Sequence, residues 1–180
     1  MQKEKDTEIR LSFVTNSSRL THEQERMNPH KLKELANSVS LESDSLFTLR
    51  VAFGVACAVR VAHFLTDSEI SEYLQVGNEY VRGSIPKSKL AEAAKKAKIS
   101  ARSHPGSGLI DGCGNAAVSS SYCVAAALAS HALVAAEYSA YASVYAYSSS
   151  AVTDPTAYSD EHEWQVSRFQ ELLCLSLIHI

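Results

Sequence analysis

Residues 116–151 read AAVSSSYCVAAALASHALVAAEYSAYASVYAYSSSA, and this stretch decides the fold. It contains neither Gly nor Pro, and its only formal charge is Glu137. Alanine is the strongest helix former and serine is tolerated, so the stretch is predicted to be helical. Tyr138, Tyr141 and Tyr145 are spaced i, i+3, i+7, which places them on one helical face. We therefore predict a largely buried helix or helical hairpin of small residues, with a break near Ser130.

Apolar residues repeat at helical spacing on both sides of this segment. The pattern is weak over residues 21–41 and clear elsewhere, so the flanking helices are predicted at about residues 45–64, 66–80, 87–102 and 159–173. There is no β-rich half and no tandem repeat. The sequence therefore predicts an all-α fold, a compact bundle of five to seven helices around the Ala/Ser/Tyr-rich central segment.

The predicted helix ends carry recognisable signals. Ser45 is a candidate N-cap, and Thr66–Glu69 has the form of a capping box. Arg82-Gly83 should end the helix that follows, because Gly accepts the left-handed conformation common after a helix. Pro86 suits the first turn of the next helix, and Ser159-Asp160 is expected to cap the last one.

The chain divides into three parts. Residues 1–20 are predicted to be an N-terminal arm, which forms either a short strand around Ile9–Val14 or no fixed structure. Residues 21–173 form the predicted helical domain. The sequence of residues 174–180, CLSLIHI, is unlike the rest of the chain and resembles a translated sequencing-adapter read-through. These residues are therefore predicted to be a non-native tail. The alternative is a native apolar strand or helix end.

Composition limits the classes of function that this chain can have. The 180 residues suit one domain, and the 46% hydrophobic content is typical of a soluble globular protein. A net charge of −3 argues against nucleic-acid binding, and no apolar run approaches the ~20 residues of a membrane span. The charged start has no apolar signal-peptide core, so a cytoplasmic location is predicted. The four cysteines show no CxxC spacing and are expected to be reduced, buried thiols: Cys57, Cys113, Cys123 and Cys174.

Candidate catalytic motifs are incomplete. Ser84–Lys87 matches SxxK, but the second serine motif and KTG-like strand of that chemistry are absent. Asp111–Asn115 is either a nucleophilic-cysteine turn with His131 as base or, as we favour, a helix start. His162 has acidic neighbours that suit a metal site or a helix N-terminus, and we favour the latter. No His is preceded by Glu three positions earlier, as ferritin-like bundles require. No catalytic residue, metal ligand or cofactor is therefore predicted.

Four segments nevertheless follow one another in a family-like order: Ala56–Ala62 (ACAVRVA), Tyr80–Ile85 (YVRGSI), His131–Tyr138 (HALVAAEY) and Glu163–Gln165 (EWQ). Over residues 46–173 the chain resembles the Imm5-like immunity proteins of bacterial polymorphic toxin systems. Three positions depart from that pattern. Ala127 replaces a second histidine, Val59 replaces a glutamate, and Thr66–Ile70 replaces a P-x-D-x-R-P turn.

The resemblance implies a small, non-enzymatic helical protein that binds and neutralises a cognate toxin domain. The candidate positions that it marks are Arg60, Arg82, His131, Tyr138, Trp164 and Gln165. Two alternatives from other classes stay open. One is a helical scaffold or homodimer that uses the Ala/Ser/Tyr face as its interface, and the other is a helical-bundle enzyme or metal-carboxylate protein.

Overall fold

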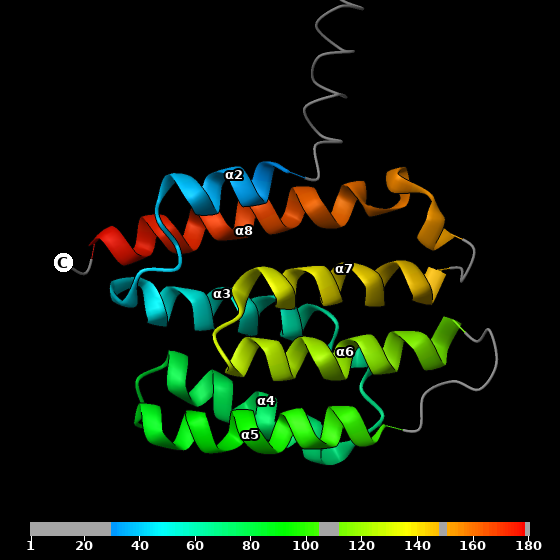
Figure 1. The fold of residues 1–180 in the computed structure, drawn as a ribbon, viewed down its shortest axis with the longest axis horizontal. Coiled ribbons are helices and arrows are strands. Elements are labelled where there is room, and N and C mark those ends of the chain that lie inside the picture. Colours follow the sequence, from blue (N-terminus) through cyan, green and yellow to red (C-terminus); the bar gives the residue numbers. More distant parts are fainter. Residues whose placement is uncertain (1–29, 105–111, 148–150, 179–180) are drawn as a thin grey trace, which may run out of the picture.

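The computed structural model describes residues 30–104, 112–147 and 151–178, and every regular element in these ranges is helical. The predicted all-α class is confirmed. With the labels of Figure 1, the α-helices of these ranges are α2 (Lys31–Ser38), α3 (Phe47–Arg60), α4 (Ser68–Val81), α5 (Lys87–Ser103), α6 (Gly112–Leu128), α7 (Ala132–Tyr147) and α8 (Ser159–Ile178). The shorter 3₁₀ turns are η1 (Asp44–Leu46), η2 (Ala62–Phe64), η3 (Ala151–Thr153) and η4 (Pro155–Tyr158). None of these helices is long and apolar enough to cross a membrane.

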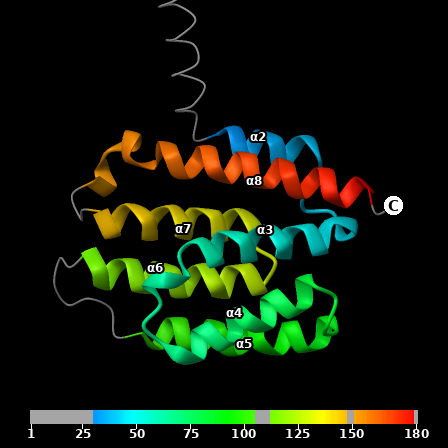
Figure 2. The ribbon, with the colours of Figure 1, turned by 180° about the vertical axis from the view of Figure 1, so that it is seen from behind.

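The helices form three layers with roughly aligned axes (Figure 1 and Figure 2). α2 and α8 make one outer layer, α4 and α5 make the other, and α3, α6 and α7 lie between them. α3 contacts α4, α6, α7 and α8, and eight of its 14 residues are buried. α3 is therefore the element around which both outer layers are assembled.

The Ala/Ser/Tyr segment folds as predicted, into the hairpin of α6 and α7. Small residues on both helices are buried between α6, α7 and α3, which lets the backbones approach closely. Gly54 of α3 shows how closely, because a Cβ built there would lie 2.9 Å from the Cα of Ala127. The expected tyrosine stripe is half-buried but divided: Tyr138 stacks on Tyr122 of α6, whereas Tyr141 contacts Tyr145 and Tyr158.

Two of the predicted breaks are confirmed. Gly83 follows α4 with φ +73°, and its N–H donates to the carbonyl of Tyr80, which is the expected left-handed helix end. Ser130 separates α6 from α7 with φ 59° and donates its N–H to the carbonyl of Ala127 in the same way. A serine here takes the place of the usual glycine.

The predicted N-terminal caps are shifted. Ser45 lies inside η1 and caps no helix, and α3 ends at Arg60 rather than near Phe64. For α4 the cap is Asp67, not Thr66: the Asp67 carboxylate accepts the N–H of Glu69 at 2.8 Å. Pro86 occupies the cap position before α5 instead of its first turn, and Ser159 is already the first residue of α8. Each cap therefore lies within one or two residues of its predicted position.

Other predictions concern the chain ends and the thiols. Cys57 and Cys123 are buried, as expected, but Cys174 is exposed on α8, so the prediction of a buried thiol is wrong there. α8 continues to Ile178, so residues 174–178 of the segment predicted as a non-native tail extend this helix, and residues 179–180 lie outside the described residues. The arm predicted for residues 1–20 and the side chain of Cys113 lie outside the described residues.

Candidate functional site

Three of the six candidate positions meet where α3 packs on α8. Arg60, the last residue of α3, places its Nε 2.5 Å from Oε2 of Glu161 on α8. The same guanidinium lies over the ring of Trp164, with its central carbon 4.4 Å from the centroid. Arg60 therefore forms an ion pair and a cation–π contact at once, both with residues of one helix face. The Glu161 side chain is only 5% exposed, against 38% for Arg60.

Gln165 extends this cluster inward to α7. Its Nε2 donates to the carbonyl of Ala136 at 2.8 Å and to Oγ of Ser139 at 3.0 Å, and lies 3.4 Å from Oε1 of Glu161. Ser139 is fully buried, and its Oγ lies 3.2 Å from the same Glu161 oxygen. Within the described part of the chain, no buried side-chain N or O atom lacks a hydrogen-bond partner. The cluster thus meets the requirement that polar groups removed from water be paired.

Two thiols lie beside this cluster. Burial, together with the negative charge of Glu161, raises the pKa of Cys57 far above its usual range, although Ser139 bonds to the thiol. Burial, then the neighbouring Cys57 and Glu161, raise the pKa of Cys123, whose Sγ donates to the carbonyl of Ala135 at 3.2 Å. Nucleophilic cysteines react as thiolates. These two stay protonated at neutral pH and act as small core residues.

We refer to Arg60, Ser139, Glu161, Trp164 and Gln165 as the inter-helix clasp, because they join α3, α7 and α8. The carboxylate of Glu161 is committed to Arg60, Ser139 and Gln165, so it accepts bonds that hold the bundle together. Sequence reasoning missed Glu161 and Ser139. A signal existed: Glu161 stands four residues before Gln165, the spacing that aligns side chains on one helix face. From the sequence alone, the favourable charge of a helix N-terminus explains this glutamate equally well.

The other three candidate positions lie apart from the clasp. Arg82 is exposed at the C-terminal end of α4, and His131 is exposed just before α7. Tyr138 is half-buried and stacks on Tyr122, with ring centroids 5.3 Å apart. The six positions therefore do not form one site: three meet between helices, Tyr138 packs separately within the α6–α7 hairpin, and two are exposed on the surface.

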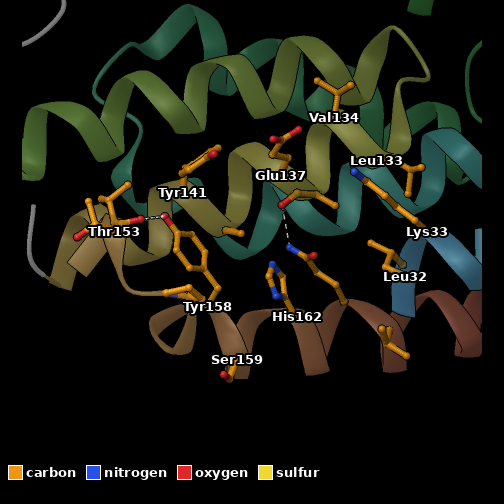
Figure 3. Close-up of a pocket in the computed structure, with 16 residues that line it drawn as sticks. Leu32, Lys33, Leu133, Val134, Glu137, Tyr141, Thr153, Tyr158, Ser159 and His162 are labelled. Carbon is orange, nitrogen blue, oxygen red and sulfur yellow. Dashed lines mark hydrogen bonds between the residues drawn. The ribbon is translucent and has the colours of Figure 1, made fainter. Parts of the chain in front are cut away.

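A pocket of about 600 Å³ opens between α2, α7 and α8 (Figure 3). It adjoins the inter-helix clasp, because Ala136 and Gln165 belong to its lining. The buried Ala136 and Ala140 of α7 contribute only methyl groups to its lining, and Leu32 and Val166 line it from α2 and α8. The loop turns η3 and η4 border the pocket through Val152, Thr153, Pro155 and Tyr158. Sequence reasoning had not identified this pocket, since it depends on how far α7 and α8 separate.

Aromatic rings form one wall of the pocket. Tyr158 meets Tyr141 edge-on at 5.8 Å and stacks on His162 at 5.8 Å. The hydroxyl of Tyr158 donates to the carbonyl of Val152 at 3.1 Å, which fixes the ring (Figure 3). Desolvation, followed by the phenols of Tyr141 and Tyr145, raises the pKa of Tyr158 to about 12. Burial lowers the pKa of His162, against a smaller opposing effect of Glu161. Both side chains are therefore uncharged at neutral pH.

The other segments with candidate chemistry take ordinary structural positions. α6 begins at Gly112, as expected of a helix start at Asp111–Asn115. Lys87, the lysine of the SxxK match, places its Nζ 3.6 Å from the ring centroid of Phe47. Across residues 30–104, 112–147 and 151–178, no group of three or more His, Cys, Asp or Glu side chains is placed to hold a metal ion. Comparison of the chain with family models, with characterised proteins and with solved structures gives no significant match.

Proposed function

We propose that this chain is an immunity protein that neutralises a cognate bacterial toxin domain by stoichiometric binding in the cytoplasm. The observation that supports this most is the spatial meeting of three family-like segments. Arg60 comes from the first segment, the Ala136 carbonyl from the third, and Trp164 and Gln165 from the fourth. Arg60 and Glu161 are 101 positions apart in the chain. Three of the four segments that carry the resemblance thus meet in one cluster of this chain.

Inhibition by binding needs a rigid scaffold and exposed complementary residues rather than an activated nucleophile. The inter-helix clasp supplies rigidity, because it joins three helices through buried, paired groups. Arg82 and His131 are the two candidate positions that are exposed to a partner. We propose that these two contribute to toxin binding and that the clasp residues act only on the fold.

The alternative scaffold function uses the Ala/Ser/Tyr face as an interface between copies. Within one chain, however, small residues of α6 and α7 are already buried: Ala116, Ala117, Ala126, Ala127, Ala135 and Ala142. A scaffold would have to use another surface. Toxin binding does not require the Ala/Ser/Tyr face to be exposed, so we favour the immunity function.

The test is co-expression of this chain with the toxin candidate encoded beside its gene. We expect growth to be rescued and the two proteins to co-purify as a one-to-one or symmetric complex. Arg82→Ala and His131→Ala should weaken the complex without lowering the melting temperature. Tyr147→Ala is the matched control, because Tyr147 is 95% exposed and lies outside the four segments.

Two results would overturn the proposal. If growth is not rescued and no neighbouring gene product forms a complex, the immunity function is wrong. If the chain instead elutes only as a homo-oligomer, by size-exclusion chromatography with light scattering, the scaffold function replaces it.

A further inference from the structure

We infer that the pocket between α2, α7 and α8 binds a small zwitterion with an aromatic or apolar body, of the amino-acid or dipeptide class. The inference does not depend on the proposed toxin binding. The pocket volume of about 600 Å³ falls inside the ~300–1,000 Å³ range of small-molecule sites. The two methyl groups of Ala136 and Ala140 keep this space open between the helices.

The interior of the pocket suits a body without charge. Its aromatic wall consists of Tyr141, Tyr158 and His162, which hold one another in edge-on and stacked contacts. Leu32 and Val166 add aliphatic surface from α2 and α8. Because burial lowers the pKa of His162 and raises that of Tyr158, neither side chain introduces a charge at neutral pH. An aromatic or branched aliphatic group is the body that such a lining stabilises best.

The rim of the pocket carries one charge of each sign. Lys33 extends from α2 toward α7, which carries Glu137 (Figure 3). Both side chains are exposed, and neither takes part in an ion pair in the part of the chain that the structure describes. A ligand carboxylate can meet the ammonium of Lys33 while a ligand ammonium meets the carboxylate of Glu137. A simple anion or a simple cation would use only half of this rim.

The experiment is an NMR titration of the full ¹⁵N-labelled chain. The probes are L-tryptophan and the dipeptide Phe-Leu, and the comparison ligand is N-acetyltryptophanamide, which has the same ring without charges. We expect amide shifts to concentrate at α2, α7, α8 and η4, with dissociation constants near or below ~1 mM. The uncharged amide should bind more weakly than tryptophan.

Variants separate the pocket body from its rim. Ala140→Phe should fill the pocket and lower probe affinity at least about tenfold, and Ala140→Leu gives the same test if the larger ring prevents folding. Lys33→Gln and Glu137→Gln should each weaken the zwitterions about 2- to 5-fold, the range of an exposed ion pair, while leaving the uncharged amide unaffected. Lys95→Gln and Glu92→Gln, at exposed positions of α5, are matched controls and should leave the affinity for every probe unchanged.

Three outcomes would overturn the inference. The probes could cause no shifts at millimolar concentration, or they could bind as well to Ala140→Phe and Ala140→Leu as to the original chain. Equal affinity for tryptophan and its uncharged amide would also contradict it, because the rim charges would then have no role. None of these measurements involves a toxin, so their failure would not contradict the proposed immunity function.

Discussion

The Arg60 side chain forms an ion pair with Glu161 and a cation–π contact with Trp164. Of these two partners, Trp164 supplies the apolar packing. The indole is half-buried against the core and lies under the guanidinium, so it belongs to the scaffold rather than to an exposed surface. A cation–π contact of this kind contributes about 0.5–2 kcal/mol, depending on its exposure to water. The ring also covers one face of the Arg60 guanidinium, which pairs with Glu161.

Trp164→Ala should therefore destabilise the fold. We expect a loss below the ~3–5 kcal/mol typical of a fully buried Trp, because this ring is only half-buried. Thermal and urea unfolding followed by circular dichroism measure it. Trp164→Phe should recover part of the loss, and Tyr147→Ala, at a 95% exposed position, is the neutral control. An unchanged melting curve together with lost toxin binding would make Trp164 an interface residue instead.

His162 predicts a pH dependence of stability. Burial lowers its pKa in the folded chain, so the unfolded chain binds a proton there at higher pH than the folded chain does. The free energy of unfolding should consequently decrease as the pH falls through ~6.5, the ordinary histidine value, and this contribution should vanish above that pH. Urea unfolding between about pH 7.5 and about pH 5.5 measures the slope.

His162→Gln removes the titrating ring and should flatten the dependence over that interval. His131→Gln is the matched control, because His131 is exposed at the start of α7. Equal slopes in the original chain and in His162→Gln would contradict this origin of the pH dependence.

Among the elements, two glycines permit close helix approaches: Gly54 of α3 against α6, and Gly77 of α4 against side chains of α6 and α3. A Cβ at Gly54 would lie 2.9 Å from the Cα of Ala127, which is backbone and cannot turn away. A Cβ at Gly77 would meet only side-chain methyl groups, Cδ2 of Leu128 at 2.7 Å and Cγ2 of Val55 at 2.9 Å. A side chain at position 54 would fit only if α3 and α6 moved apart. A side chain at position 77 would fit if the side chains of Leu128 and Val55 adjusted.

Gly54→Ala should therefore destabilise the fold more than Gly77→Ala. Overpacking typically costs about 1–3 kcal/mol. Replacing Gly by Ala inside a helix gains only ~1 kcal/mol. We expect a net loss for Gly54→Ala, because its contact is with backbone and the overpacking cost should lie in the upper part of that range. Denaturant unfolding of the two variants gives the comparison. The opposite order would show that α3 and α6 can shift apart more easily than Leu128 and Val55 can rearrange.

The sequence predicts the helices better than it predicts their ends and their contacts. Ala-rich periodicity suffices for the α6–α7 hairpin, since propensity and burial agree there. The cap of α4 is misplaced by one residue because Thr66, Asp67 and Ser68 can all accept a backbone N–H. Glu161 and Ser139 could not be paired with Arg60 from the sequence, since three helices bring them together. The exposure of Cys174 likewise depends on which face of α8 meets the core.

For the whole molecule, the three-layer arrangement predicts an order of local stability. α3, α6 and α7 are covered by other helices, whereas α2 packs chiefly on α8, and the C-terminal end of α8 exposes Cys174 and Leu175. Amide groups exchange with solvent through local openings, which need less free energy where fewer apolar contacts are broken. Hydrogen–deuterium exchange should therefore be slowest in α3 and the α6–α7 hairpin and fastest in α2 and the end of α8.

Native-state exchange in increasing urea checks this order, because central-layer amides should exchange only through global unfolding. Arg60→Met supplies a second readout. It breaks the inter-helix clasp between α3 and α8, so protection should decrease in α8 and α2 more than in α4 and α5. Uniform loss of protection over all helices would mean that the bundle opens as one cooperative unit. In that case the clasp would stabilise the whole molecule rather than the attachment of its α2–α8 layer.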